Sequence, residues 1–212
     1  MISTRNLGPI PDVPALLRLT QSLAMLDAIL SPEWEGRYYS FNSRWAEGEQ
    51  MASMRNGSGD EWFLLFFQAG AALKGFAHEA PMATTSTWPG VLSDVPPAFQ
   101  DFLTEPAFTL EDTTFCLWRT PSDTEWRRGT IAFPAGTDPD GSEDLLAIFD
   151  GEPRTYRQWA EEYYEHDVSL AAVEHVYGHR PLTPEIVAQL NPEVTLAALA
   201  EDVAEIGYPL GG

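Results

Sequence analysis

The sequence predicts an α+β protein, with an antiparallel sheet of five to seven strands, an N-terminal packing helix and a helical C-terminal third. The main observation is the run Glu61–Gln68, in which six consecutive large apolar residues stand between a charged and a polar residue. Six residues is strand length, and apolar side chains on both alternating faces are typical of a strand that is covered on both sides. Leucine spacing before this run and helix signals after residue 142 complete the prediction.

The N-terminal helix is predicted from its start signal and its apolar stripe. Asp12 precedes Val13-Pro14, and proline is well tolerated in the first turn of a helix. Leucines then recur at spacings of three and four until Ser31-Pro32, at positions Leu16, Leu19, Leu23, Leu26 and Leu30. This stripe indicates a helix whose role is packing.

The sheet is predicted to be a meander over residues 36–134. Polar, glycine-containing stretches on both sides of the central run reverse the chain, so its neighbours should be antiparallel. The expected strands are 37–42, 50–55, 61–68 and 71–76, followed by a hairpin of 113–119 with 125–128 that could continue over 130–133. Residues 78–95 lack periodicity and form a long loop, a class of segment that is often functional.

Residues 142–207 are predicted to be helical and to pack on the sheet as part of one domain, 1–212. Ser142, Ser169 and Thr183-Pro184 are helix-start signals, and the last helix should run from about Glu193 to Ile206. An aromatic stripe at Tyr156, Trp159, Tyr163 and Tyr164 is interpreted mainly as core, with a ligand clasp as the alternative.

The net charge of −20 is concentrated in the C-terminal half. Residues 1–100 contain 10 acids and 6 bases, whereas residues 101–212 contain 22 acids and 6 bases. Nucleic acids and anionic membranes need Lys or Arg to neutralise their charge, so neither is an expected partner. A basic protein partner would be attracted, although acidity that serves only solubility is an equal alternative.

The compartment is predicted to be the cytoplasm. The first nine residues contain no apolar segment of a signal peptide, and no apolar run approaches 18 residues. The single cysteine, Cys116, lies between Phe115 and Leu117 and is expected to be a buried small hydrophobe. The sequence does not indicate an oligomeric state.

Two short patterns suggest metal ligands, and each has a simpler interpretation. The stretch Asp138–Asp144 alternates oxygen ligands around a glycine but lacks the terminal glutamate of a calcium loop, so it is interpreted as a turn before a helix. His175 and His179 have zinc-like i, i+4 spacing, but Gly178 and Pro181 indicate that the helix ends between them, so a histidine that caps the negative end of the helix is the simpler interpretation. No phosphate-binding loop, dinucleotide motif or hydrolase motif occurs, and no cofactor is expected.

A polar row at one end of the sheet is the candidate catalytic site. If Ala69-Gly70 is a two-residue turn, His78 lies opposite Glu61, and the turn 56–60 places Arg55 opposite Glu61 on its other side. Such a row could orient a histidine for acid-base chemistry, with Ser58 as a nearby hydroxyl and Asp60 at the rim. The alternative is a cross-strand charge ladder that closes the sheet.

Four strings carry a resemblance to other proteins: residues 38–45 (YYSFNSRW), 54–61 (MRNGSGDE), 74–79 (KGFAHE) and 112–115 (DTTF). They resemble those of an uncharacterised family of bacterial cytosolic proteins. The resemblance spans most of the chain but implies no activity or ligand. In size, acidity and α+β layout the chain is also similar, more loosely, to immunity proteins of bacterial toxin systems.

Two functions are therefore considered. The first is a non-enzymatic, acidic protein-binding protein, of immunity or inhibitor type, that docks a basic protein partner. The alternative is a small hydrolase or metal-assisted enzyme that uses the row Arg55, Glu61 and His78, or His175 with His179.

Overall fold

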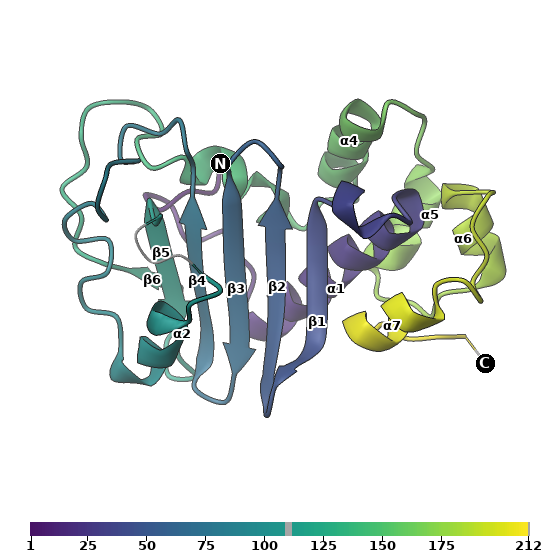
Figure 1. The fold of residues 1–212 in the computed structure, drawn as a ribbon, viewed down its shortest axis with the longest axis horizontal. Coiled ribbons are helices and arrows are strands. Elements are labelled where there is room, and N and C mark those ends of the chain that lie inside the picture. The colour runs from purple at the N-terminus through teal and green to yellow at the C-terminus, as the bar shows by residue number, and fades with distance from the viewer. Residues whose placement is uncertain (109–111, 212) are drawn as a thin grey trace.

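The computed structural model describes residues 1–108 and 112–211 and has the predicted α+β architecture (Figure 1). Six antiparallel strands form one sheet in the order β1-β2-β3-β4-β5-β6. The strands are β1 (Tyr39–Ala46), β2 (Glu49–Arg55), β3 (Glu61–Phe67), β4 (Gly70–Phe76), β5 (Phe115–Arg119) and β6 (Arg127–Arg128). The α-helices are α1 (Val13–Leu30), α2 (Gln100–Thr104), α3 (Ser142–Leu145), α4 (Pro153–Tyr164), α5 (Leu170–Tyr177), α6 (Pro184–Leu190) and α7 (Ala200–Ile206), with short 3-10 turns η1 (Trp34–Gly36), η2 (Pro97–Phe99) and η3 (Ala147–Asp150).

Strand β3 is central and buried on both faces, as its apolar run predicts. Trp62, Leu64 and Phe66 belong to the larger of two hydrophobic clusters. Phe63 and Leu65, which alternate with them, belong to the other cluster. Alternation along a strand sends successive side chains to opposite faces, so this one segment contributes to both cores.

Helix α1 packs in the larger core, with 13 of its 18 residues buried. Its length and mean hydropathy of 1.3 would allow it to span a membrane, so the expectation that no such apolar run exists is wrong. In this fold, however, the helix contacts β1, α5, α6 and α7, which cover it with protein. Burial of this apolar helix against a sheet and other helices is the arrangement of a globular core.

The smaller core lies on the opposite face of the sheet, beneath the segment between β4 and β5. Met82, Val91, Phe102 and Phe108 from this segment pack on β3, β4 and β5. In Figure 1, α2 lies in front of this part of the sheet, whereas no helix lies in front of β1 and β2. The long segment after residue 78 is therefore a cover for half of one sheet face. Cys116 is buried beneath it, as predicted.

The predicted pairing between β3 and β4 is wrong by two residues. Phe67 pairs with Gly70, so Gln68-Ala69 forms the turn, and Glu61 faces Phe76 rather than His78. Gly70 is the first residue of β4, where its φ of +123° is favourable only for glycine. A Cβ atom there would lie 2.0 Å from the carbonyl oxygen of Arg119. The glycine thus permits close approach of the end of β5.

Two further predicted elements differ from the structure. Residues 130–133 form no strand, because Thr130 and Ala132 hydrogen-bond to the 88–94 loop instead of to the sheet. The last helix begins at Ala200 rather than near Glu193. In the preceding turns the side chains of Asn191 and Thr195 accept backbone N–H groups, which offers the chain an alternative to helical hydrogen bonds.

Candidate functional site

The predicted polar row forms only in part. Arg55 pairs with Glu61 across β2 and β3, as expected, with 3.6 Å between Nε and Oε2. The third member is not opposite Glu61, because Phe76 occupies that position in β4. The shift of two residues keeps the same sheet face but moves His78 beyond the end of the strand.

His78 instead binds Asp60, which the sequence placed at the rim of the row. The Asp60 carboxylate accepts the backbone N–H of His78 at 2.8 Å, and its Oδ1 lies 2.7 Å from the imidazole Nδ1. Glu79 lies 3.9 Å from the other ring nitrogen. The hydrogen bond to Asp60 raises the pKa of His78, and the charges of Asp60 and Glu79 act in the same direction. Carboxylates beside both nitrogens favour imidazolium, which is a poor general base.

Replacing Asp60 with asparagine should lower the pKa of His78, because the carboxylate hydrogen bond is its main cause. The native pair stabilises the fold below the ordinary pKa of histidine, and this contribution is lost as the pH rises through the higher folded pKa. NMR titration of the imidazole protons measures the change, with the other three histidines as internal controls. An unchanged His78 midpoint in Asp60→Asn would show that the pair does not determine the pKa.

The two predicted metal patterns have structural roles among the described residues. Helix α5 ends at Tyr177, and His179 lies beyond it with a φ of 50°. The His175 Nε2 lies 2.9 Å from the carbonyl oxygen of Pro181. His179 packs edge-on against Tyr208, with ring centroids 4.8 Å apart. Within residues 1–108 and 112–211, no three His, Cys, Asp or Glu side chains group as metal ligands.

The Asp138–Asp144 segment is a turn that precedes α3, as its simpler interpretation predicts. The Asp138 carboxylate accepts the backbone N–H groups of Glu143 and Asp144 at 3.0 to 3.3 Å. The buried Asp140 carboxylate accepts hydrogen bonds from the hydroxyls of Thr4 and Ser142. Asp138 thus binds the backbone at the start of α3, and Asp140 joins the turn to the N-terminal segment.

The aromatic stripe of α4 surrounds a buried acid that sequence reasoning missed. Asp27 in α1 is 0% exposed and accepts the Tyr156 hydroxyl at 2.6 Å. It also accepts the backbone N–H groups of Tyr38 and Tyr39, at 2.9 and 2.7 Å. Burial raises the pKa of Asp27 to about 6, although these hydrogen bonds oppose the shift. The available signal was a single acid in the otherwise apolar stretch Leu23–Leu30.

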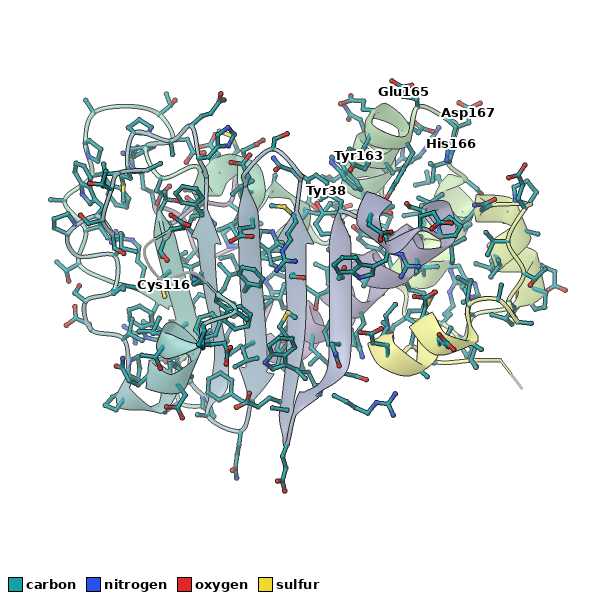
Figure 2. The ribbon with its side chains drawn as sticks, in the orientation of Figure 1. Tyr38, Cys116, Tyr163, Glu165, His166 and Asp167 are labelled. Carbon is teal, nitrogen blue, oxygen red and sulfur yellow. The ribbon has the colours of Figure 1, made fainter. Side chains whose placement is uncertain are left out.

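The outer part of the stripe reaches the surface next to the start of β1. Tyr163 is 41% exposed, and its ring centroid lies 5.2 Å from that of Tyr38. Figure 2 shows these two side chains together, with Glu165, His166 and Asp167 at the adjoining end of α4. The stripe is therefore core at Tyr156 and an exposed aromatic edge beside acidic residues at Tyr163.

A groove lies on the part of the sheet that residues 77–108 leave uncovered. Two adjoining cavities of about 210 and about 200 Å³ share Trp34, Ser40, Ser53 and Arg55 in their linings. The first also contacts Glu35 and Tyr38, and the second also contacts Trp45, Phe63, Phe108 and Glu205. We call this feature the tryptophan groove. It contains one predicted site residue, Arg55.

The floor of the tryptophan groove follows from the strand register. Ser40, Ser53 and Phe63 are successive cross-strand partners and share the face that opposes α1. The row continues with Lys74 and Cys116 beneath the cover formed by residues 77–108, where burial lowers the pKa of Lys74 to about 8. The same sheet face is thus polar where it is open and mainly apolar where it is covered.

Trp34 and Trp45 are groove residues that the sequence did not single out. Trp34 lies in η1, between Glu33 and Glu35, and is 59% exposed. The stretch Pro32-Glu33-Trp34-Glu35, a tryptophan in a polar loop, was a signal that could have identified it, because exposed tryptophans are enriched at binding sites.

Comparisons of the chain with protein-family models, curated protein sequences and solved structures find no match. The fold defines an α+β protein with one sheet and a helical third. The chemistry of its exposed surface is therefore the basis on which a function is inferred.

Proposed function

We propose that this protein is a non-enzymatic cytoplasmic binding protein, of immunity or inhibitor type, that docks a basic protein partner. The observation that carries the proposal is the unpaired acidity of the helical third. Residues 142–207 contain 14 acids, of which 11 are exposed, and three arginines. The exposed acids are Asp144, Asp150, Glu152, Glu162, Glu165, Asp167, Glu174, Glu185, Glu193, Glu201 and Glu205.

These carboxylates remain available to a partner. None of the 11 forms an ion pair with another described residue, whereas Glu161 and Asp202, which are less exposed, pair with Arg157 and Arg37. A further hollow of about 560 Å³ is lined by Asp138, Glu143, Asp144 and Asp150, among others. Clustered charge of one sign attracts an oppositely charged protein and accelerates its association.

The hydrolase alternative has less geometric support. It relied on Glu61 orienting His78, but the side chain opposite Glu61 is Phe76, and His78 lies between carboxylates that favour its protonated form. The metal version relied on His175 and His179, which lie on either side of a helix end.

Affinity purification from the source cell at low salt, followed by native mass spectrometry, tests the proposal. We expect a stoichiometric complex with a protein of basic isoelectric point, which dissociates as salt screens the charges. A variant with Glu162→Gln, Glu165→Gln and Asp167→Asn should bind the partner more weakly. The matched control, Glu47→Gln, Glu125→Gln and Asp101→Asn, also removes three negative charges, at exposed positions outside the helical third.

Recovery of no partner at low salt would contradict the proposal. A partner that is acidic, or a complex whose affinity does not depend on salt, would contradict it equally, because charge complementarity predicts the opposite in both cases.

A further inference from the structure

The walls of the tryptophan groove are aromatic and partly rigid. Trp45 stacks on Phe108, with centroids 5.7 Å apart and planes at 24°, and Phe108 stacks on Phe63 at 4.5 Å. Trp34, from η1, lines both cavities and exposes 59% of its surface. A cavity of about 150 Å³ accommodates benzene, so each of these cavities has room for a planar group.

The charge of the groove is negative after its ion pairs are considered. Arg37 is bound by Asp202, with 3.2 Å between Nη2 and Oδ2, and Arg55 lies beside Glu61. Glu35 and Glu205 also line the groove, and neither has an ion-pair partner within the described ranges. The uncompensated groups are thus two carboxylates, which favour a cation.

The floor of the groove has hydrogen-bonding capacity that the fold does not use. Within residues 1–108 and 112–211, no hydrogen bond joins the hydroxyl of Ser40 or Ser53 to another protein group, and neither hydroxyl is among the buried atoms without a partner, so both are open to the groove. Each hydroxyl can accept one N–H group and donate to another acceptor. A ligand with several N–H donors would satisfy both serines.

We propose that the tryptophan groove receives an arginine side chain of the basic partner, an inference that rests on the proposed function. The guanidinium stacks on Trp34, pairs with Glu205 or Glu35, and donates to the serine hydroxyls. Arginine suits the groove better than lysine, because its planar group stacks on aromatic rings and carries five donors in a fixed geometry. Trp34 is then the anchor of the interface, in keeping with the enrichment of tryptophan at binding hot spots.

The experiment is an NMR titration that observes the tryptophan indole N–H signals. The probes are the capped peptides acetyl-Gly-Arg-Arg-Gly-amide, its dilysine counterpart and its diglutamate counterpart, at low ionic strength. We expect saturable shifts at Trp34 and Trp45 with the arginine peptide, weaker ones with lysine and none with glutamate. Trp126 is the internal reference, because it is 3% exposed and its indole N–H donates to the Pro11 carbonyl.

Two variants locate the binding. Trp34→Ala should abolish the saturable Trp45 shift, and the fold should persist because this side chain is exposed. Glu205→Gln should weaken binding of the arginine peptide by about threefold or more, through loss of a cation's counter-charge. Glu193→Gln is the matched control, since it removes the same charge at an exposed position that does not line the groove.

The outcomes separate this inference from the proposed function. If the arginine peptide binds the acidic helices but leaves Trp34 and Trp45 unshifted, or if its binding survives Trp34→Ala, the groove inference fails and the proposed function stands. If the glutamate peptide shifts the groove signals, the groove binds anions at Arg55 and the inference is overturned. If no peptide binds at low ionic strength, the groove inference fails, whereas the proposed function is still decided by whether a basic partner is recovered.

Discussion

Asp27→Ala is expected to lower the free energy of unfolding by about 3 to 5 kcal/mol at pH 5, where the folded protein keeps the carboxyl proton, because buried donors that lose their acceptor cost about 1 to 3 kcal/mol each. The change removes the acceptor of the Tyr156 hydroxyl and of two backbone N–H groups, on Tyr38 and Tyr39. These groups join α1 to α4 and to the start of β1. In a chain of this size the melting temperature should fall by about 6 to 20 °C, measured by calorimetry or circular dichroism.

Asp27→Asn is the matched control. The asparagine side chain has the shape of aspartate and keeps one oxygen that accepts hydrogen bonds, so this variant should lose only about 1 kcal/mol of unfolding free energy. A loss in Asp27→Ala no larger than that in Asp27→Asn would contradict the network's importance.

The pH dependence of stability should identify the same carboxyl group. Burial raises the pKa of Asp27 from 3.8 to about 6, so between these values the unfolded chain ionises while the folded protein retains its proton. Stability from this group is therefore present below pH 3.8 and falls as the pH rises to about 6, by about 3 kcal/mol in total. Urea unfolding across this range should show the decline in the native protein, and Asp27→Asn should lack this component. If the free energy of unfolding fell equally with pH in the native protein and in Asp27→Asn, the decline would not come from Asp27.

Gly70→Ala is expected to destabilise the protein by about 3 kcal/mol or more, because it combines backbone strain with a steric clash. The φ of +123° disfavours a side chain, and the new Cβ would lie 2.0 Å from the Arg119 carbonyl oxygen. This clash is relieved only if the end of β5 moves away from β4. Chemical denaturation of the purified variant measures the loss.

Gly136→Ala provides the control for backbone strain alone. Gly136 has a φ of +140°, and no atom lies within 4 Å of its hypothetical Cβ. It is a better match than Gly48, whose φ of +76° is close to the left-handed region that other residues adopt. The Gly136 substitution should cost about 1 to 3 kcal/mol, from backbone strain without a clash. If both variants lost the same stability, the contact between Gly70 and Arg119 would not limit the fold.

The central strand could be predicted from sequence because its signal is local. A six-residue apolar run requires cover on both faces wherever it lies in a fold, and Trp62–Phe67 has that cover. The pairing of this strand was harder, because Gly70 has two possible roles. In a turn, Gly70 would be needed for its positive φ alone. In the structure it is also needed because it has no Cβ, which lets the backbone of Arg119, 49 residues later, lie in contact with it.

The candidate site was less predictable than the fold. Arg55 and Glu61 were paired correctly because they flank a short turn, whose length determines which residues face each other. The tryptophan groove depends on which part of the sheet residues 77–108 cover, and the sequence around Trp34 and Trp45 does not indicate which part that is. Asp27 was missed because its partners come from β1 and α4.

The sequence by itself determined the α+β class, the central strand, the N-terminal helix and the acidic character of the C-terminal half. These properties depend on periodicity and composition, which are read within a few residues or summed over the chain. Only the tertiary structure decided the β3–β4 register, the Asp60–His78 pair, the hydrogen bonds to Asp27 and the tryptophan groove. Each of these depends on contacts between segments distant in sequence, or on a turn that tertiary contacts select, and such contacts leave no regular spacing in the chain.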